Sequence, residues 1–269
     1  AFALLQREGG YGRSANAQGD PESVMQIAKH LPPLQQTSRG ICVEIHHRLA
    51  APRTTAQDPA GDPSLWNRLN EVPIGRQPVT FLSPTETLLH LIMHAAYDHY
   101  FNNGPLILSD IRYLLQRNSI DWPLFWKRAQ ACKVVRGCQL TLAMAQALVP
   151  SLSVQSDASG HPVEPVLEDA LNLLLRSLAN RGSTLAIGEL QQGGGQRWQR
   201  LTSRVLPSRT SMAARYPVTS DSIKVWLYYP VLWRRLIRDR LPAISRHLFD
   251  RGTQAEVIRL NRVRAWMED

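Results

Sequence analysis

The stretch that most constrains this chain is Ile41–Leu49, in which apolar and polar side chains alternate. Successive side chains of a strand point to opposite faces, so the alternation predicts a strand with one buried face. One face carries Ile41, Val43, Ile45 and His47, and the other carries Cys42, Glu44, His46 and Arg48. An acid, an imidazole and a guanidinium in one row are costly to bury. The polar face therefore borders either a cleft or open solvent, and both interpretations stay open.

The composition is that of a folded protein with a sizeable core. The chain has 269 residues, of which 43% are hydrophobic, enough for one large domain or two smaller ones. Its three cysteines, Cys42, Cys132 and Cys138, form no CxxC motif, which predicts reduced thiols with a buried structural role. No apolar run reaches the roughly 18 residues that a transmembrane helix needs. We therefore expect a cytoplasmic protein without a transmembrane segment.

The positive charge of the chain is concentrated in its last third. From Arg176 onward there are 16 arginines and one lysine against seven acids, a net charge of +10, whereas the preceding residues carry −1. Arg234, Arg235 and Arg238 follow an amphipathic helical pattern, for which a solvated face is the simplest interpretation. The alternative is a surface for an anionic partner such as nucleic acid, an anionic membrane or an acidic protein.

Helical patterns dominate after a short αβ region. The chain begins inside a predicted helix, Ala1–Glu8, from which we expect further coding sequence upstream. Prolines make residues 51–78 a long connection with one helical turn near Leu65. Further helices are predicted at 85–100, 106–117, 123–133, 134–148, 164–180, 222–248 and 253–267. The predicted fold class is α+β, with an αβ unit at 1–78, a helical domain at 79–150 and a basic, mainly helical region at 151–269.

One predicted helix carries a row of chemically reactive groups on a single face. Ser83 and Glu86 form the pattern of a capping box at its start. Glu86, His90 and His94 follow at four-residue spacing, which can hold zinc, although Leu91 stands where a metalloprotease needs its general base. Two other interpretations stay open: imidazoles that are hydrogen-bonded between helices, and a polar face that meets a substrate.

The next predicted helix, 106–117, carries Asp110 and Arg112, an acid and a base close together. A solvated or salt-bridged helix face is the simpler interpretation of this pair. A direct role in binding substrate is the alternative.

Several motifs occur in an order that is typical of a known family. A helix that ends in Gly10-Tyr11 precedes the strand V-E-I-H-H-R-L and a proline-rich connection. There follow S-P-T-E-T-L-L-H-L-I-M-H-A-A, L-S-D-I-R-Y-L-L and I-D-W-P-L-F-W-K-R-A. Over residues 1–150 the chain resembles the uncharacterised nucleotidyltransferase family of bacteria, in the polymerase-beta-like nucleotidyltransferase superfamily. The similarity continues weakly through 206–209 and 215–217.

This resemblance implies a small mixed sheet that bears three metal-binding carboxylates, with helices packed alongside. Glu44 matches the third carboxylate and would orient the acceptor hydroxyl, with His46 beside it as the second catalytic residue. The first two carboxylates would precede the helix that contains Ala1, so residues 1–269 alone are expected to be inactive. In the complete protein, two Mg²⁺ ions would assist transfer of a nucleotidyl group from a nucleoside triphosphate (NTP) to an unidentified acceptor.

The same resemblance makes His90 and His94 a wall of the cleft, and Asp110 and Arg112 are the remaining candidates for substrate binding. Two rival interpretations stay open. The first is a non-catalytic scaffold or binding protein that uses its basic helical C-terminal region. The second is a zinc hydrolase that uses Glu86, His90 and His94.

Overall fold

A computed structural model describes residues 1–14, 19–36, 38–52, 56–156, 160–176 and 202–269, and for 239–249 it describes the backbone alone. The chain divides into two units, each built from two stretches that lie far apart in the sequence. The first unit is Ala1–Pro52 with Leu190–Ser245, and the second is Arg53–Glu189 with Arg246–Asp269. The three-part division of the chain into 1–78, 79–150 and 151–269 stays a prediction.

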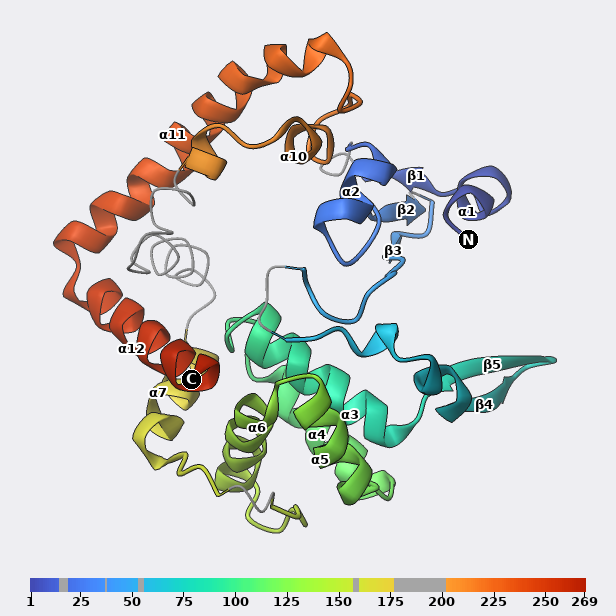
Figure 1. Cartoon of the computed structure of the whole chain (residues 1–269), viewed down its shortest axis with the longest axis vertical. Helices are drawn as coiled ribbons and strands as arrows, with labels where there is room; N and C mark the ends of the chain where they lie inside the picture. The colour runs from blue at the N-terminus through green and yellow to red at the C-terminus, as the bar shows by residue number, and fades with distance from the viewer. Residues whose placement is uncertain (15–18, 37, 53–55, 157–159, 177–201) are drawn as a thin grey trace. The chain divides into compact units, whose positions relative to one another are not determined.

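The first unit begins with helix α1 (Phe2–Glu8) and a small antiparallel sheet (Figure 1). The strands β1 (Gly12–Arg13), β2 (Leu34–Gln36) and β3 (Ile41–Val43) pair in the order β1-β2-β3. Helix α2 (Pro21–Ile27) lies between β1 and β2 in the chain. It begins at Asp20, whose carboxylate accepts a hydrogen bond from the Ser23 N–H at 2.9 Å, a standard way to satisfy the first turn of a helix.

β3 is shorter than the strand predicted over 41–49. Ladder pairing ends at Val43, and Ile41, expected on the buried face, is exposed. The alternation of exposure nevertheless continues beyond the strand. Val43, Ile45 and His47 are half-buried, whereas Glu44, His46 and Arg48 are exposed. The predicted two-sided pattern is therefore correct, although regular strand geometry covers only its start.

The C-terminal stretch of the first unit packs against α2. It contains α10 (Arg209–Ala213), the 3₁₀ helix η4 (Ile223–Leu227) and, up to Ser245, α11 (Tyr228–Phe249). The Asp20 N–H donates a hydrogen bond to the Ala213 carbonyl at 2.8 Å. A Cβ atom added at Gly19 would lie 2.0 Å from the Ala214 carbonyl oxygen, so only glycine allows this approach. The core of this stretch consists of Met212, Tyr216, Val225, Tyr229 and Leu232.

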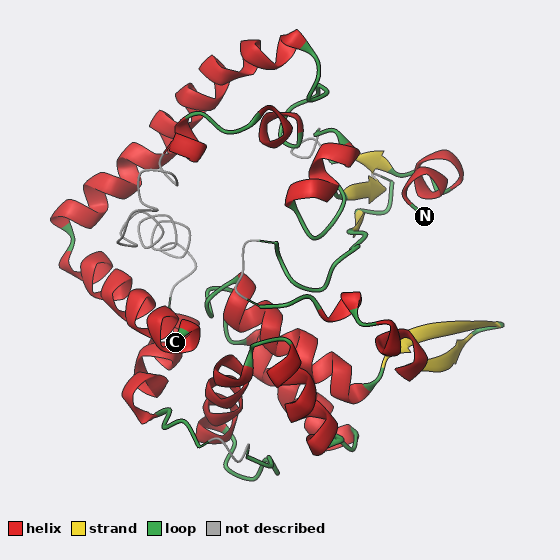
Figure 2. Ribbon diagram, viewed as in Figure 1, coloured by secondary structure: helices red, strands yellow, loops and turns green. Residues whose placement is uncertain are grey.

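The second unit opens with a β-hairpin that the sequence did not indicate (Figure 2). Its elements are η1 (Pro59–Gly61), η2 (Pro63–Arg68), β4 (Leu69–Ile74) and β5 (Gln77–Leu82). The single helical turn predicted near Leu65 is η2, but the rest of the predicted connection forms the hairpin. Pro73 and Pro78 face each other across it, and Gly75 turns the chain with a φ of 63°. Proline is tolerated here because both strands are edge strands.

The remainder of the second unit is helical. Its helices are α3 (Pro84–Met93), the π-helix η3 (His94–Asp98), α4 (Leu106–Arg117), α5 (Trp122–Ala131), α6 (Val135–Leu148), α7 (Glu164–Leu175) and α12 (Arg251–Glu268). The predicted α+β class is confirmed, and the helices appear close to their predicted bounds, apart from the end of 164–180, which lies partly outside the described residues. Both described sheets are antiparallel, whereas the resemblance had implied a mixed sheet.

Two of these helical segments approach closely at Tyr97 of η3 and Gly137 of α6. The Gly137 N–H donates a hydrogen bond to the Tyr97 hydroxyl oxygen at 3.1 Å. A Cβ atom at position 137 would lie 2.4 Å from the Tyr97 ring, so the contact requires glycine. Burial raises the pKa of the Tyr97 hydroxyl well above its ordinary value, which keeps it protonated in the core.

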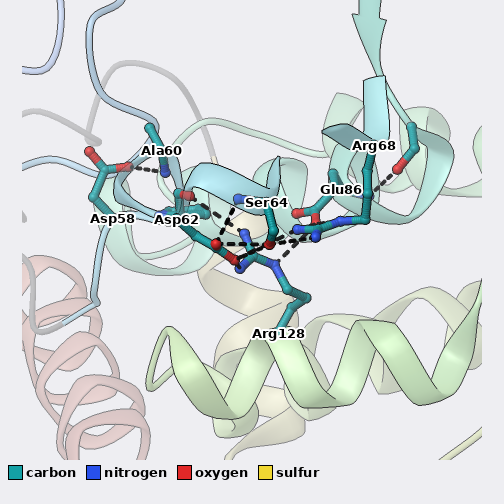
Figure 3. A network of polar contacts seen from close by, with 9 residues as sticks. Asp58, Ala60, Asp62, Ser64, Arg68, Glu86 and Arg128 are labelled. Carbon is teal, nitrogen blue, oxygen red and sulfur yellow. Dashed lines mark hydrogen bonds and ion pairs between the residues drawn. The ribbon is translucent and has the colours of Figure 1, made fainter. Parts of the chain in front are cut away.

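A buried ion-pair network joins three parts of the second unit (Figure 3). Glu86 of α3 is 3% exposed, and its Oε1 lies 2.8 Å from Arg68 Nη2 and 3.0 Å from Arg128 Nε. Arg128, from α5, also pairs with Asp62, and Arg68 donates to the Ser64 hydroxyl at 2.6 Å. The Ser64 hydroxyl donates a hydrogen bond to the Asp62 carboxylate. This bond and the positive charge of nearby Arg128 lower the pKa of Asp62 below its ordinary value. This network fixes the start of α3 against η2 and α5.

The predicted capping box is therefore only half formed. The Ser83 hydroxyl accepts a hydrogen bond from the Glu86 N–H at 3.4 Å, as expected for an N-cap. The Glu86 carboxylate binds the two arginines instead of turning back to Ser83, because two guanidinium groups, of which that of Arg128 is buried, are much stronger partners than one backbone N–H.

The variant Glu86→Gln should lower the free energy of unfolding by about 3–5 kcal/mol, because it leaves Arg68 and Arg128 facing a neutral side chain in a buried site. Urea unfolding followed by circular dichroism measures the change. Glu71→Gln is the control, since Glu71 is exposed on β4 and its replacement should change stability by less than about 0.5 kcal/mol. Equal effects of the two variants would contradict a structural role for the network.

The variant Gly137→Ala should lower the free energy of unfolding by about 1–3 kcal/mol, because its methyl group overlaps the Tyr97 ring. Gly61→Ala is a matched control, since nothing lies within 4 Å of a Cβ built there. Thermal unfolding of both variants provides the comparison. If Gly137→Ala unfolds at the same temperature as the parent chain, the close approach of Tyr97 and α6 is wrong.

Candidate functional site

The segment that carries Glu44 and His46 is held by backbone hydrogen bonds rather than by a long ladder. The Leu31 N–H donates to the Ile45 carbonyl at 2.9 Å, and the His47 N–H donates to the Lys29 carbonyl at 3.0 Å. His46 also forms an isolated bridge with His30. The segments 29–31 and 45–48 are therefore fixed side by side. The exposed side chains between these bonds keep a defined direction.

His47 has a structural role. Its Nε2 lies 2.9 Å from the Ala28 carbonyl oxygen, which can only accept a hydrogen bond, so Nε2 carries the proton and donates. This bond ties the segment to the end of α2. The sequence placed His47 on the inward face of the strand, and its half-buried position agrees with that prediction.

Glu44 and His46 lie together on the outward face. His46 Nε2 is 3.6 Å from Glu44 Oε2, and the two side chains are 32% and 47% exposed. The His30 ring centre lies 5.4 Å from that of His46. His30 Nδ1 donates to the Leu31 carbonyl at 2.9 Å, which leaves its Nε2 for another partner. A carboxylate and two imidazoles thus form one exposed polar group, defined here as the Glu44 cluster.

The electrostatics of the Glu44 cluster favour a neutral His46. Burial lowers the pKa of His46 from its ordinary value, and the nearby positive charge of Lys29 and the His30 ring lower it further. Glu44 acts in the opposite direction and raises it. Near neutral pH His46 therefore holds a lone pair that can accept a hydrogen bond or a proton. Lys29 is 9% exposed and makes the backbone contacts described above.

His90 and His94 belong to the second unit and form a group of their own. Their ring centres are 6.1 Å apart, and the His94 ring makes an edge contact with His99 at 4.5 Å. His94 Nδ1 lies 3.3 Å from the Asp98 carboxylate, whose side chain is 5% exposed. The π-helix η3 brings Asp98 to this distance. His94 is thus hydrogen-bonded within its own segment, whereas hydrogen bonding of the imidazoles between helices and the role of both histidines in substrate binding stay predictions.

Asp110 and Arg112 are both exposed on α4. They lie in the same unit as His90 and His94, whereas Glu44 and His46 belong to the other unit. The exposed positions agree with a solvated helix face. Their predicted role in substrate binding is not tested by this geometry.

The zinc-hydrolase interpretation needs Glu86 to bind the metal together with His90 and His94, and the structure does not support this. The Glu86 carboxylate is buried between Arg68 and Arg128, so it is engaged away from His90 and His94. Among the described residues, no group of three or more His, Cys, Asp or Glu side chains is arranged to hold a metal ion. The pattern of four-residue spacing therefore reflects an ion pair and an imidazole group rather than one metal site.

Part of the positive charge of the last third is used within the fold. Asp169 of α7 binds Arg262 at 2.7 Å and Arg259 at 3.6 Å, both from α12. Glu256 of α12 binds Arg176 at 3.4 Å. These pairs join α7 and α12. Binding of an anionic partner by this region stays a prediction.

Sequence reasoning missed His30 of the Glu44 cluster and Lys29 beside it, which both precede the strand. Lys29 and His30 follow α2 and showed no motif of their own. Only the pairing of residues 29–31 with 45–48 brings them to Glu44. In the described helices, none combines the length and hydropathy needed to cross a bilayer, in agreement with the sequence.

Opposite changes around His46 should move its pKa in opposite directions. Glu44→Gln removes the carboxylate that raises this pKa, so it should fall, whereas Lys29→Met removes a positive charge that lowers it, so it should rise. Titration of the His46 ring protons by NMR measures both. Glu22→Gln, an exposed change on α2, should leave the midpoint unchanged. An unchanged midpoint in the Glu44→Gln variant would show that the two side chains do not interact.

Comparison with protein-family models assigns the sequence to a family. The family model described as uncharacterised nucleotidyltransferase matches residues 1–150, which include the Glu44 cluster and helices α3 and α4. Comparisons with curated proteins and with solved structures found no match. The match covers more than half of the 269 residues. The chain therefore belongs to the uncharacterised nucleotidyltransferase family.

Proposed function

We propose that this protein transfers a nucleotidyl group from an NTP to a hydroxyl or phosphate acceptor, with Glu44 as the carboxylate beside the acceptor. The observation that carries the proposal is the contact of Glu44 with His46 at 3.6 Å on the outward face of a fixed segment. Family membership over residues 1–150 supports the reaction class. The family is uncharacterised, so the acceptor must be inferred from this chain.

The proposed step is an in-line displacement at the α-phosphorus of the NTP. The acceptor oxygen forms a bond to that phosphorus, and the bond to the bridging oxygen breaks, so pyrophosphate leaves with the electron pair. Glu44 orients the acceptor hydroxyl by accepting its hydrogen bond and then its proton. His46 positions the Glu44 carboxylate and lies where the transferred phosphate would approach.

The residues described here do not by themselves fit a two-Mg²⁺ centre. Mg²⁺ prefers several carboxylate oxygens in a near-octahedral arrangement, and Glu44 supplies one carboxylate next to two imidazoles and the positive charge of Lys29. No step of the proposal is therefore routed through a metal ion. The Mg²⁺ expected from the family resemblance requires the paired acids that the resemblance places before Ala1.

We propose that His90 and His94 contact the substrate through their half-buried rings, of which the His94 ring is held by Asp98 and His99 and lies beside the His90 ring. An imidazole that is fixed by a carboxylate is a suitable donor to a phosphate oxygen. The exposed Asp110 and Arg112 are the second pair proposed for substrate binding, since both are accessible on α4.

The activity is tested on residues 1–269 and on the protein extended by any residues encoded upstream of Ala1, each incubated with labelled ATP and Mg²⁺. Glu44→Gln should reduce transfer by about 10²-fold or more, because it cannot accept the hydroxyl proton. Glu22→Gln is the exposed control and should keep full activity. If the extended protein neither binds nor consumes NTP, or Glu44→Gln has full activity, the proposed reaction fails.

A second candidate, a non-catalytic binding protein, is favoured by one observation. Ile223 and Leu227 of η4 are 81% and 72% exposed, and Arg234 and Arg238 of the following helix α11 are exposed as well. Exposed apolar residues beside basic ones are typical of helices that bind an anionic surface. Binding to anionic vesicles that weakens with salt, without NTP consumption by the extended protein, would favour this candidate over transfer.

A further inference from the structure

The first unit contains a cavity of about 540 Å³ between its two stretches of chain. One side is formed by the end of α2 and the loop 28–33, and the other by residues 214–216 and the first turns of α11. This volume lies within the range of roughly 300–1,000 Å³ in which small-molecule sites fall. Neither the sequence motifs nor the proposed roles of Glu44 and His46 account for it.

The walls of the cavity are fixed by packing rather than by loose loops. Gly19 lies against the Ala214 backbone, so the two stretches meet without a gap at that end. Tyr216 stacks on Tyr228 with ring centres 4.8 Å apart, and the Tyr229 hydroxyl donates to the Pro207 carbonyl at 2.7 Å. A cavity with fixed walls loses little entropy when it binds a ligand.

The lining combines an apolar floor with basic groups. The apolar part includes Val24, Leu31, Leu232 and Leu236. The basic part is Arg215, Arg235 and His30. Among the described residues that line the cavity there is no Asp or Glu. Two guanidinium groups and an imidazole favour an anion with several oxygens, and phosphate fits that set of donors well.

The cavity is connected to the Glu44 cluster through one residue. His30 lines the cavity, and its ring centre lies 5.4 Å from that of His46, which in turn contacts Glu44 at 3.6 Å. A molecule in the cavity can therefore contact His30, which lies beside the His46 ring that contacts the carboxylate assigned to the acceptor.

We propose that this cavity binds the acceptor, and that the acceptor is a phosphate ester with an apolar body. Its phosphate lies between Arg215, Arg235 and His30, and its apolar part covers Leu232 and Leu236. The identification as acceptor rests on the proposed transferase function, whereas binding of such an ester does not.

The test is binding of phenyl phosphate to the chain of residues 1–269, measured by calorimetry and by NMR of the His30 ring. Phenyl phosphate should bind more tightly than inorganic phosphate and than phenol, since only it has both parts. The double variant Arg215→Gln with Arg235→Gln should weaken binding by about tenfold or more. The matched control is Arg39→Gln with Arg76→Gln, which keeps the net charge of the double variant and replaces exposed residues outside the lining.

Three results would overturn the assignment: no saturable binding of phenyl phosphate, equal binding of phenol, or equal losses in the two double variants. Vesicles of phosphatidic acid in phosphatidylcholine distinguish the source of the phosphate ester. Vesicle binding that is lost in the Arg215 and Arg235 variant assigns the site to a lipid phosphate, and binding of phenyl phosphate alone assigns it to a soluble ester. NTP consumption by the extended protein without phenyl phosphate binding would reject the cavity and leave the transferase standing. Binding of phenyl phosphate without NTP consumption by the extended protein would support the cavity as a ligand site and reject the transferase function.

Discussion

The second unit depends on one buried carboxylate, that of Glu86, and on the two guanidinium groups that face it. A charge with 3% exposure is stable only when it is paired, because its lost hydration must be replaced by nearby partners. Arg68 is the last residue of η2, and Arg128 lies on α5. Their pairing with Glu86 therefore holds both elements against the first turn of α3. The hairpin β4–β5 lies in the chain between Arg68 and α3, and its two ends are therefore fixed by the same charges.

Local sequence signals predicted the helices well. Helix α4 has the predicted bounds, and α6 starts one residue later than predicted, because apolar spacing and the flanking prolines and glycines act within a few residues. The hairpin was missed because Pro73 and Pro78 read as breakers, and only their position on edge strands makes them compatible with pairing. The destination of the Glu86 side chain was missed for another reason. Its partners are 18 and 42 positions away, and no spacing rule reaches them.

In the Glu44 cluster, too, the features that depend on neighbouring residues were predicted, and those that depend on distant segments were missed. Alternation along 41–49 separated the outward Glu44 and His46 from the inward His47, as the exposures and the His47 hydrogen bond confirm. Lys29 and His30 join them only through backbone pairing with an earlier segment. Arg215 and Arg235 belong to the cavity because α10 packs on α2, a contact between segments at opposite ends of the sequence. The net charge showed that basic residues are concentrated from Arg176 onward, but it did not indicate which of them line a cavity.

The interleaving of the two units has a consequence for the order in which the protein assembles. Ribosomal synthesis releases α2 long before α10, yet the Asp20 N–H finds its acceptor only at Ala213. During that interval the nascent helices α3 to α6 are already complete and can pack through their own local contacts, which form fast. The αβ segment must wait, with one side of α2 uncovered, until the chain has grown beyond Tyr229. A polypeptide stopped at residue 150 would thus retain every motif of the family match and still lack the wall that closes its first unit.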